Sequence, residues 1–178
     1  SVFATIANSG QQCKPQSIES VTDRNENVLK EFAADCKEVI SPELANKTAA
    51  LLTASAGQYY TSTRLGDGRP FAAKSGTTDG HANTWLTGFT PSLATSVWVG
   101  HGDNSSQEVS GVVINGVYHS EIFGETYVGQ NIWAPYMTQA LAGTPIEAVS
   151  NANIGATTPQ RGTTPTPTPS ASPTSNDH

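Results

Sequence analysis

The sequence has few charged and few strongly apolar residues. Over its 178 residues, charged residues make up 13% and hydrophobic residues 36%. Gly, Ser, Thr and Asn fill the difference, which excludes a coiled coil or a highly charged disordered chain and favours strands and loops. The most apolar stretch, around residues 93–99, is far too short to cross a bilayer. We therefore expect one polar domain with a core of its own and an attached tail.

The sequence also has no cluster of basic residues. The formal net charge is −6. Residues 151–178 hold one acid and one base, so residues 1–150 carry the whole charge, with 8 basic and 14 acidic residues (8 − 14 = −6). This balance argues against nucleic acid or an anionic membrane as the main partner.

Cysteine is scarce: only Cys13 and Cys36 are present. Two sulfurs cannot complete a structural zinc site. Either they form a disulfide that closes a hairpin-like loop, which needs an oxidising compartment, or they are two separate thiols in a reducing one. Their polar surroundings favour the disulfide.

Apolar spacing predicts a helix over residues 2–7 with no capping segment before it, so we expect further protein upstream. Residues 17–22 and 28–32 predict a hairpin. Ser41 and Pro42 are typical of a helix start, and Gly57 predicts the helix end. The apolar face of this helix is expected to comprise Leu44, Thr48, Leu51, Leu52 and Ser55.

Residues 69–78, 84–90 and 94–100 read as three strands. Their connectors are short, which forces an antiparallel meander. Asn115-Gly116 predicts a second hairpin within residues 111–120, and residues 133–142 predict a final helix with an apolar stripe. That stripe comprises Ile132, Tyr136, Met137, Ala140 and Leu141.

Four aromatic residues alternate in a way that places them in a core between sheet and helix rather than on a ligand platform. They are Trp85, Phe89, Trp98 and Trp133. From about Asn151 the chain becomes rich in Pro and Thr with no residue that would form a core, so we expect a disordered or extended tail.

Lys74 stands among small residues inside an otherwise apolar strand, which packing alone does not select. Ser75, Gly76 and Thr77 follow it. Their small side chains keep the strand surface shallow, so that a substrate backbone can approach closely.

Residues 68–75 nearly match a phosphate-binding loop, with Gly, four residues, and then Gly-Lys-Ser. Ala73 replaces the second Gly, and Pro70 removes a backbone donor. Strand and turn residues follow in place of the helix whose N-terminus would face the phosphates. We therefore reject this interpretation.

Lys74-Ser75-Gly76 matches the Lys-Thr/Ser-Gly signature of penicillin-binding proteins and serine β-lactamases, which lies on a strand beside the active site. The stretches 85–91 (WLTGFTP) and 93–100 (LATSVWVG) extend the match. Together they resemble the three-strand meander of bifunctional (class A) penicillin-binding proteins. Further parts of the chain also resemble that family, namely Cys13-Lys14-Pro15, residues 39–43, Phe123-Gly124 and the helix at Trp133.

The resemblance implies an α+β fold in which helices flank an antiparallel sheet. Residues 1–147 would be the C-terminal part of a transpeptidase domain, and residues 148–178 a Pro/Thr/Ser-rich disordered tail. It implies no cofactor and no metal. Three histidines near two aspartates have spacings that fit no helix or zinc pattern; they are His81, His101 and His119, with Asp79 and Asp103.

By the same resemblance, Lys74 would hold the anionic substrate and tune proton transfer near the nucleophile. Ser75 would turn its hydroxyl toward the site, and Gly76 would let a substrate peptide pair with the strand edge. The backbone N–H of Thr77 would be one of two oxyanion-hole donors. The hydroxyls of Thr77 and Thr78 would bind the terminal carboxylate of a D-Ala-D-Ala peptide or of penicillin.

The chain departs from the family at the nucleophile. The family uses Ser with Lys three residues later, but no lysine here has Ser at that distance. The residues that stand three positions before the five lysines are Gln11, Asn27, Ala34, Leu44 and Phe71. No Asn follows a Ser by two positions either, so the Ser-x-Asn signature is missing too.

We therefore expect the C-terminal segment of a peptidoglycan D,D-transpeptidase, with its nucleophile outside this chain. Its partners would be stem peptides, β-lactams and the upstream part of the same protein, which would carry a glycosyltransferase domain and a membrane anchor. It would work on the extracytoplasmic face of a bacterial membrane. A non-catalytic cell-wall peptide-binding module stays open as an alternative; the tail and residues 85–91 disfavour a serine β-lactamase.

Overall fold

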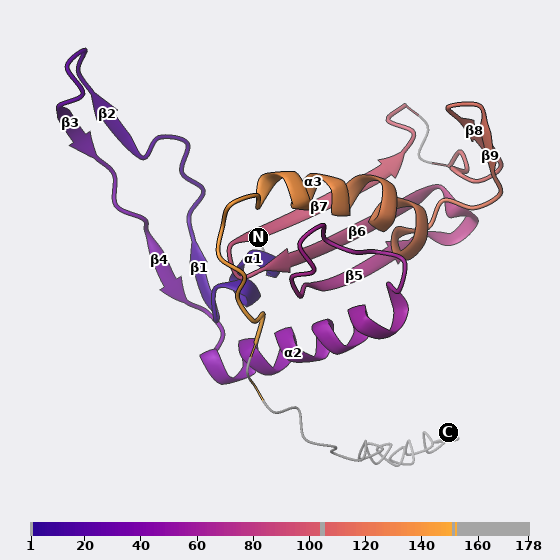
Figure 1. Ribbon diagram of the computed structural model, residues 1–178, viewed down its shortest axis with the longest axis horizontal. Coiled ribbons are helices and arrows are strands. Elements are labelled where there is room, and N and C mark those ends of the chain that lie inside the picture. Colours follow the sequence, from indigo (N-terminus) through magenta and orange to yellow (C-terminus); the bar gives the residue numbers. More distant parts are fainter. Residues whose placement is uncertain (1, 104–105, 151, 153–178) are drawn as a thin grey trace, which may run out of the picture.

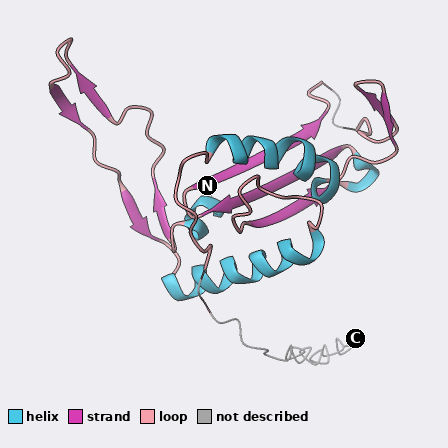
Figure 2. Cartoon of the chain, in the orientation of Figure 1, coloured by secondary structure: helices cyan, strands magenta, loops and turns pink. Residues whose placement is uncertain are grey.

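A computed structural model describes residues 2–103, 106–150 and 152. Its centre is a three-stranded antiparallel sheet in the order β5-β6-β7 (Figures 1 and 2). The strands are β5 (Ala72–Thr77), β6 (Asn83–Thr90) and β7 (Leu93–Gly100). The register runs without a shift from Ala72 opposite Phe89 to Thr77 opposite Thr84. The predicted meander and the mixed helix-and-sheet class are confirmed.

Helices cover the two faces of this sheet unequally. A Cβ added at Gly88 would point at Trp133, the last residue of the π-helix η2 (Gly124–Trp133), which continues into α3 (Ala134–Ala140). Phe89 points to the opposite face, because successive side chains of a strand alternate. There it meets Phe3 of α1 (Val2–Ala7), with ring centroids 6.1 Å apart. The larger core cluster includes Trp133, and the smaller one lies under α1.

Helix α2 (Pro42–Tyr59) runs beside β5 (Figure 1). Its start is as predicted, since Ser41 Oγ accepts the N–H of Leu44 at 3.4 Å. The predicted end at Gly57 is wrong, because the helix passes through this residue.

The predicted apolar face of α2 is right only in part, because Leu52 packs against the smaller core cluster while two other predicted members face solvent. Leu44 and Leu51 are each 58% exposed, and the buried residues are alanines, Ala45, Ala49 and Ala56. Small side chains let α2 lie close to its neighbours. The size of the side chains, more than their hydrophobicity, therefore determines which face of α2 is buried.

An arm projects from the body (Figure 1). Its stem pairs β1 (Gln11–Cys13) with β4 (Cys36–Glu38), and its outer part pairs β2 (Ser20–Thr22) with β3 (Val28–Glu31). Cys13 lies opposite Cys36 and the two form a disulfide, as the sequence favoured. The predicted hairpin is present, although its strands are shorter than expected.

The second predicted hairpin is confirmed. β8 (Val112–Ile114) pairs with β9 (Val117–His119) around Asn115 and Gly116, whose φ angles are 51° and 80°. The final helix α3 is shorter than predicted at both ends, because η2 occupies its first residue and the helix ends at Ala140. Met137 and Leu141 of the expected stripe are buried.

Other residues of that stripe, and two of the four predicted core aromatics, are not in the core. Ile132 and Tyr136 are 37% and 53% exposed, and Trp85 and Trp98 are 44% and 41% exposed. The two tryptophans lie opposite each other on the face of the sheet that α1 covers only at one end. The alternation of side chains along the strands predicted that both tryptophans share a face with Phe89. It did not predict that no helix covers this end of the face.

None of the helices within the described residues is long and apolar enough to cross a membrane. Most of the predicted tail lies outside these residues. Contacts with the body reach Ser150, whose hydroxyl donates to Asn46 O at 2.8 Å.

Candidate functional site

The candidate site is the outer edge of β5, with which no strand pairs among the described residues. Burial along this strand changes from one end to the other. Ala72 and Ala73 are fully buried, while Lys74, Gly76 and Thr77 are exposed. The strand therefore leaves the core where the predicted site residues begin, and neighbouring positions of one strand bring them together.

Ser75 directs its backbone groups to this edge. Its N–H donates to Tyr60 Oη at 2.6 Å, and its carbonyl accepts Lys74 Nζ at 2.8 Å. The N–H groups of a strand point alternately to its two sides. Because the register is continuous, the N–H of Thr77 points to the same edge as that of Ser75.

Lys74 and Ser75 line a hollow of about 340 Å³. The end of α2 and the start of η2 complete its wall, through Ser55, Tyr59, Tyr60 and Glu125. The hollow thus combines an ammonium, a carboxylate and hydroxyl groups beside the strand edge. Such convergent polar groups are typical of a binding site for a polar ligand.

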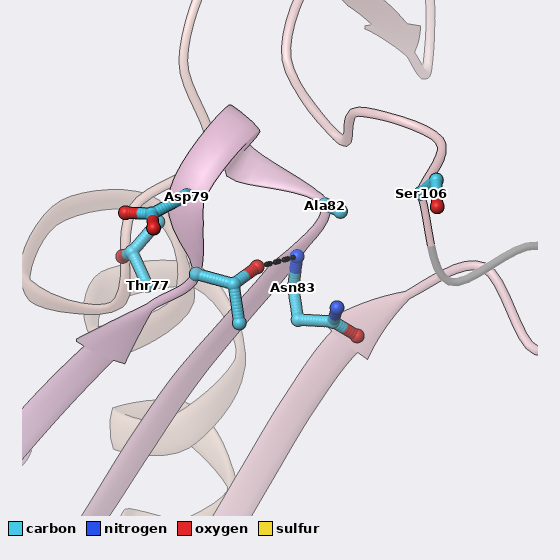
Figure 3. Close-up of a pocket in the computed structure, with 6 residues that line it drawn as sticks. Thr77, Asp79, Ala82, Asn83 and Ser106 are labelled. Atoms are coloured by element: carbon cyan, nitrogen blue, oxygen red, sulfur yellow. Dashed lines mark hydrogen bonds between the residues drawn. The ribbon is translucent and has the colours of Figure 1, made fainter.

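Thr77 and Thr78 line a second, wider hollow of about 620 Å³. Figure 3 shows Thr77 and Asp79 on one side of it and Ser106 on the other. Thr78 Oγ1 accepts the N–H of Asn83 at 3.0 Å, and Thr78 N–H donates to Asn83 O at 3.0 Å. The Thr78 hydroxyl therefore stabilises the turn into β6 and still has its proton to donate to a ligand.

The two hollows lie at successive positions along one strand edge. Lys74 and Ser75 open to the first, and Thr77 and Thr78 to the second. Sequence reasoning missed Tyr60, which contacts this edge from outside the strand. Its position directly after α2 carries no motif, so no local signal marks it.

Two of the three histidines considered for metal binding, His81 and His119, pack against aromatic rings. The centroid of the His81 ring lies 5.2 Å from that of Phe123, and the centroid of His119 lies 4.6 Å from that of Tyr127. Within the part of the chain that the structure describes, no group of three or more His, Cys, Asp or Glu residues is placed to hold a metal ion.

Known proteins with similar sequences are penicillin-binding proteins, in agreement with this geometry. No family model matches the chain. It is 35% identical over 156 residues to penicillin-binding protein 2D of Bacillus subtilis, covering 80% of this chain. It is 36% identical over 154 residues to penicillin-binding protein 1A of Mycobacterium tuberculosis, covering 81%. The chain spans 20% and 18% of the lengths of these two relatives.

The fold agrees with these relatives. The crystal structure of penicillin-binding protein 1A from Haemophilus influenzae superposes with a TM-score of 0.61 at 20% identity. The match covers 83% of this chain and 26% of that one. The fold is thus that of penicillin-binding transpeptidase domains. The chain belongs to the class A penicillin-binding proteins.

Proposed function

We propose that the chain is the C-terminal part of a D,D-transpeptidase that crosslinks peptidoglycan stem peptides, with its nucleophile on upstream sequence of the same protein. One observation carries the proposal: Lys74, Ser75 and Thr77 follow each other along an open strand edge, with the Thr77 N–H directed outward. Residues 1–147 would belong to the domain and residues 148–178 to a tail.

In this proposal, Thr77 N–H donates to the oxygen that becomes negative when the carbonyl is attacked. The Thr77 and Thr78 hydroxyls bind the terminal carboxylate, and Gly76 allows the peptide to approach. Lys74 Nζ leaves Ser75 O for the anionic substrate and the proton-transfer network around the nucleophile. Ser75 contributes its hydroxyl from the same edge.

The reaction would proceed in two acyl transfers. The serine oxygen attacks the carbonyl between the two D-Ala residues, the C–N bond breaks, and D-Ala leaves with the proton as a free amine. A stem-peptide amine then attacks the ester, forms the crosslinking amide and returns the proton to serine. With a β-lactam, the ring amide opens and the acyl-enzyme persists.

In this proposal the protein works on the extracytoplasmic side of a bacterial membrane, within the cell wall. The upstream sequence would supply the anchor and a glycosyltransferase domain. The disulfide agrees with an oxidising compartment.

Intact-protein mass after incubation with benzylpenicillin tests the proposal. We expect the full-length gene product to gain one penicillin mass and the present chain alone to gain none. Replacing Lys74 with Ala in the full-length protein should slow acylation by about 100-fold, the scale expected for one electrostatic contact to the reacting centre.

Lys47→Ala is the matched control, since Lys47 is an exposed lysine of α2 that pairs with Glu43. It should leave the rate unchanged. If the full-length protein gains no mass, the enzyme proposal fails, and the strand edge is that of a non-catalytic peptide-binding module. If the present chain alone is acylated, it holds a nucleophile that the sequence signatures did not reveal.

A further inference from the structure

Tyr60 caps the edge of β5 from the end of α2. Its side chain is only 2% exposed, and its hydroxyl accepts the N–H of Ser75 at 2.6 Å. Buried tyrosine hydroxyls usually find a hydrogen-bond partner. Here the partner is a backbone group that an adjoining strand would otherwise use.

The other edge-facing group of Ser75 is also satisfied from within the chain, because Lys74 Nζ donates to its carbonyl. A peptide that adds to a strand edge needs free N–H and C=O groups on that edge. Ser75 presents a capped N–H, so an added peptide cannot pair there while Tyr60 holds it. The next residue that faces outward is Thr77.

Between these two positions the strand is held only weakly by packing. Gly76 is exposed and has no side chain, and a Cβ placed there would have one neighbour within 4 Å, at 3.9 Å. Among the described residues, the hydrogen bond from Ser75 N–H to Tyr60 Oη is thus the last contact that a side chain outside the sheet makes with this edge before Thr77. This bond holds the edge two residues before Thr77, and the pairing with β6 sets the direction of the Thr77 N–H from there.

We propose that Tyr60 is a positioning residue. Its hydroxyl holds the Ser75 N–H, restricts substrate pairing to Thr77 and beyond, and keeps the strand edge in the place from which the Thr77 N–H reaches the oxyanion. The inference rests on the proposed function, since it acts through the oxyanion donor named there.

Single-turnover acylation by a chromogenic cephalosporin, measured on the full-length protein, separates binding from chemistry. Tyr60→Phe keeps the buried ring and removes only the hydroxyl. We expect the limiting acylation rate to fall about tenfold, the scale of a misplacement below 1 Å. The dissociation constant of the non-covalent complex should stay within about twofold.

The final stoichiometry distinguishes positioning from folding. Misfolding lowers the fraction of molecules that become acylated, whereas a misaimed donor lowers the rate and leaves one acyl group per molecule. Tyr136→Phe, at a 53% exposed tyrosine of α3, should change neither quantity.

An unchanged limiting rate in Tyr60→Phe overturns the inference and leaves the proposed function intact. A change confined to the dissociation constant or to the final stoichiometry overturns it as well. If the unaltered full-length protein is never acylated, the proposed function fails, and the inference fails with it.

Discussion

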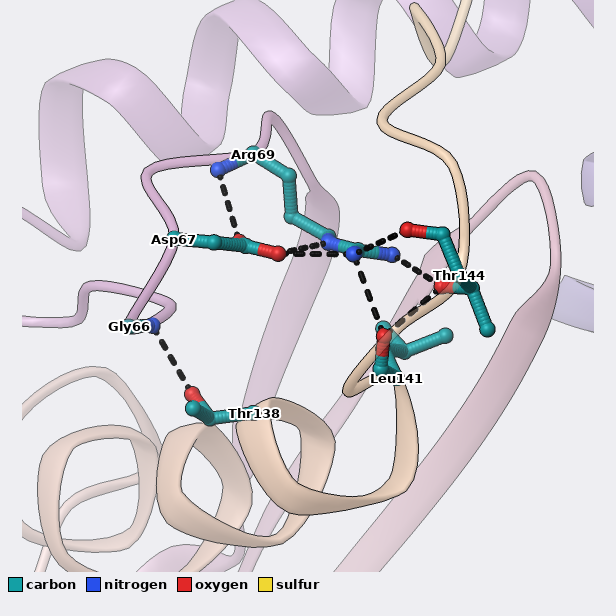
Figure 4. A network of polar contacts seen from close by, with 6 residues as sticks. All are labelled: Gly66, Asp67, Arg69, Thr138, Leu141 and Thr144. Carbon is teal, nitrogen blue, oxygen red and sulfur yellow. Dashed lines mark hydrogen bonds and ion pairs between the residues drawn. The ribbon is translucent and has the colours of Figure 1, made fainter.

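The guanidinium of Arg69 binds Thr144 twice, with Nη1 2.8 Å from Oγ1 and Nη2 3.1 Å from the backbone carbonyl. It also donates to Leu141 O and pairs with Asp67 (Figure 4). Arg69 is only 5% exposed, yet its cationic head is satisfied from several directions. One side chain thus joins the turn before β5 to the segment after α3. This link holds α3, and η2 before it, on the sheet.

Arg69→Lys should destabilise the full-length protein by roughly 2–4 kcal/mol. Lysine keeps the charge but cannot reproduce the planar set of donors, so carbonyls at the end of α3 lose their partners. The measurement is the thermal unfolding midpoint. Arg24→Lys, at an exposed position in the arm, should change stability by less than about 0.5 kcal/mol, and an equal loss in both variants would contradict the expectation.

Asp67 makes this contact depend on pH. The side-chain hydrogen bond from Arg69, and then the one from the Arg69 N–H, hold the pKa of Asp67 below its ordinary value of 3.8. Because the folded pKa is the lower one, the stabilisation is present above pH 3.8 and is lost as the pH falls below it. The difference in unfolding midpoint between the unaltered protein and Asp67→Asn should therefore shrink as the pH falls from 7 to 3.

Glu121→Gln serves as the control, since this residue is exposed. A midpoint difference for Asp67→Asn that stays constant over the whole pH range would show that the carboxylate charge is not what stabilises the turn.

Two glycines should respond to alanine with opposite signs. A Cβ at Gly124 would overlap with Trp85 O and lie 2.8 Å from Ser75 Cβ, so Gly124→Ala pushes η2 away from the site strand. We expect a loss of roughly 1–3 kcal/mol and slower acylation, since Ser75 is displaced. At Gly57, inside α2, nothing lies within 4 Å, and alanine should stabilise by about 0.5–1 kcal/mol. If the two variants shift the unfolding midpoint in the same direction, this pair of predictions is wrong.

Local features account for what the sequence predicted well. The hairpin at Asn115-Gly116 follows from turn chemistry that needs positive φ. Lys74 to Thr77 lie together because they are neighbours on β5, and Thr78 directly follows them, so the existence of a site edge did not depend on tertiary packing.

Tertiary packing accounts for what the sequence did not predict. Leu44 appeared to be a core residue, but the inner face of α2 is made of alanines because the helix lies close to its neighbours. The contact between Tyr60 and Ser75 depends on how α2 sits against β5, which no local pattern encodes. Alternation placed Trp85 on a face without showing whether anything covers that face.

The tryptophan pair makes the present chain, taken alone, a poor folding unit. Trp85 and Trp98 are 44% and 41% exposed, with ring centroids 6.3 Å apart, on a sheet face that α1 covers only at one end. Domains are stable when each apolar face packs against another layer. We expect the isolated chain to aggregate or to unfold without a cooperative thermal transition, because the pair forms an exposed apolar patch.

Replacing both tryptophans with threonine, a residue that suits strands, should raise the soluble fraction of the isolated chain after expression. Tyr118→Thr, at a 66% exposed aromatic residue of β9, should not, since it lies outside this patch. In the full-length protein the same double variant should destabilise rather than help, because the upstream part would cover the face there. A soluble, cooperatively unfolding isolated chain would instead mean that the sheet needs no further cover, and that α1, η2 and α3 complete its core.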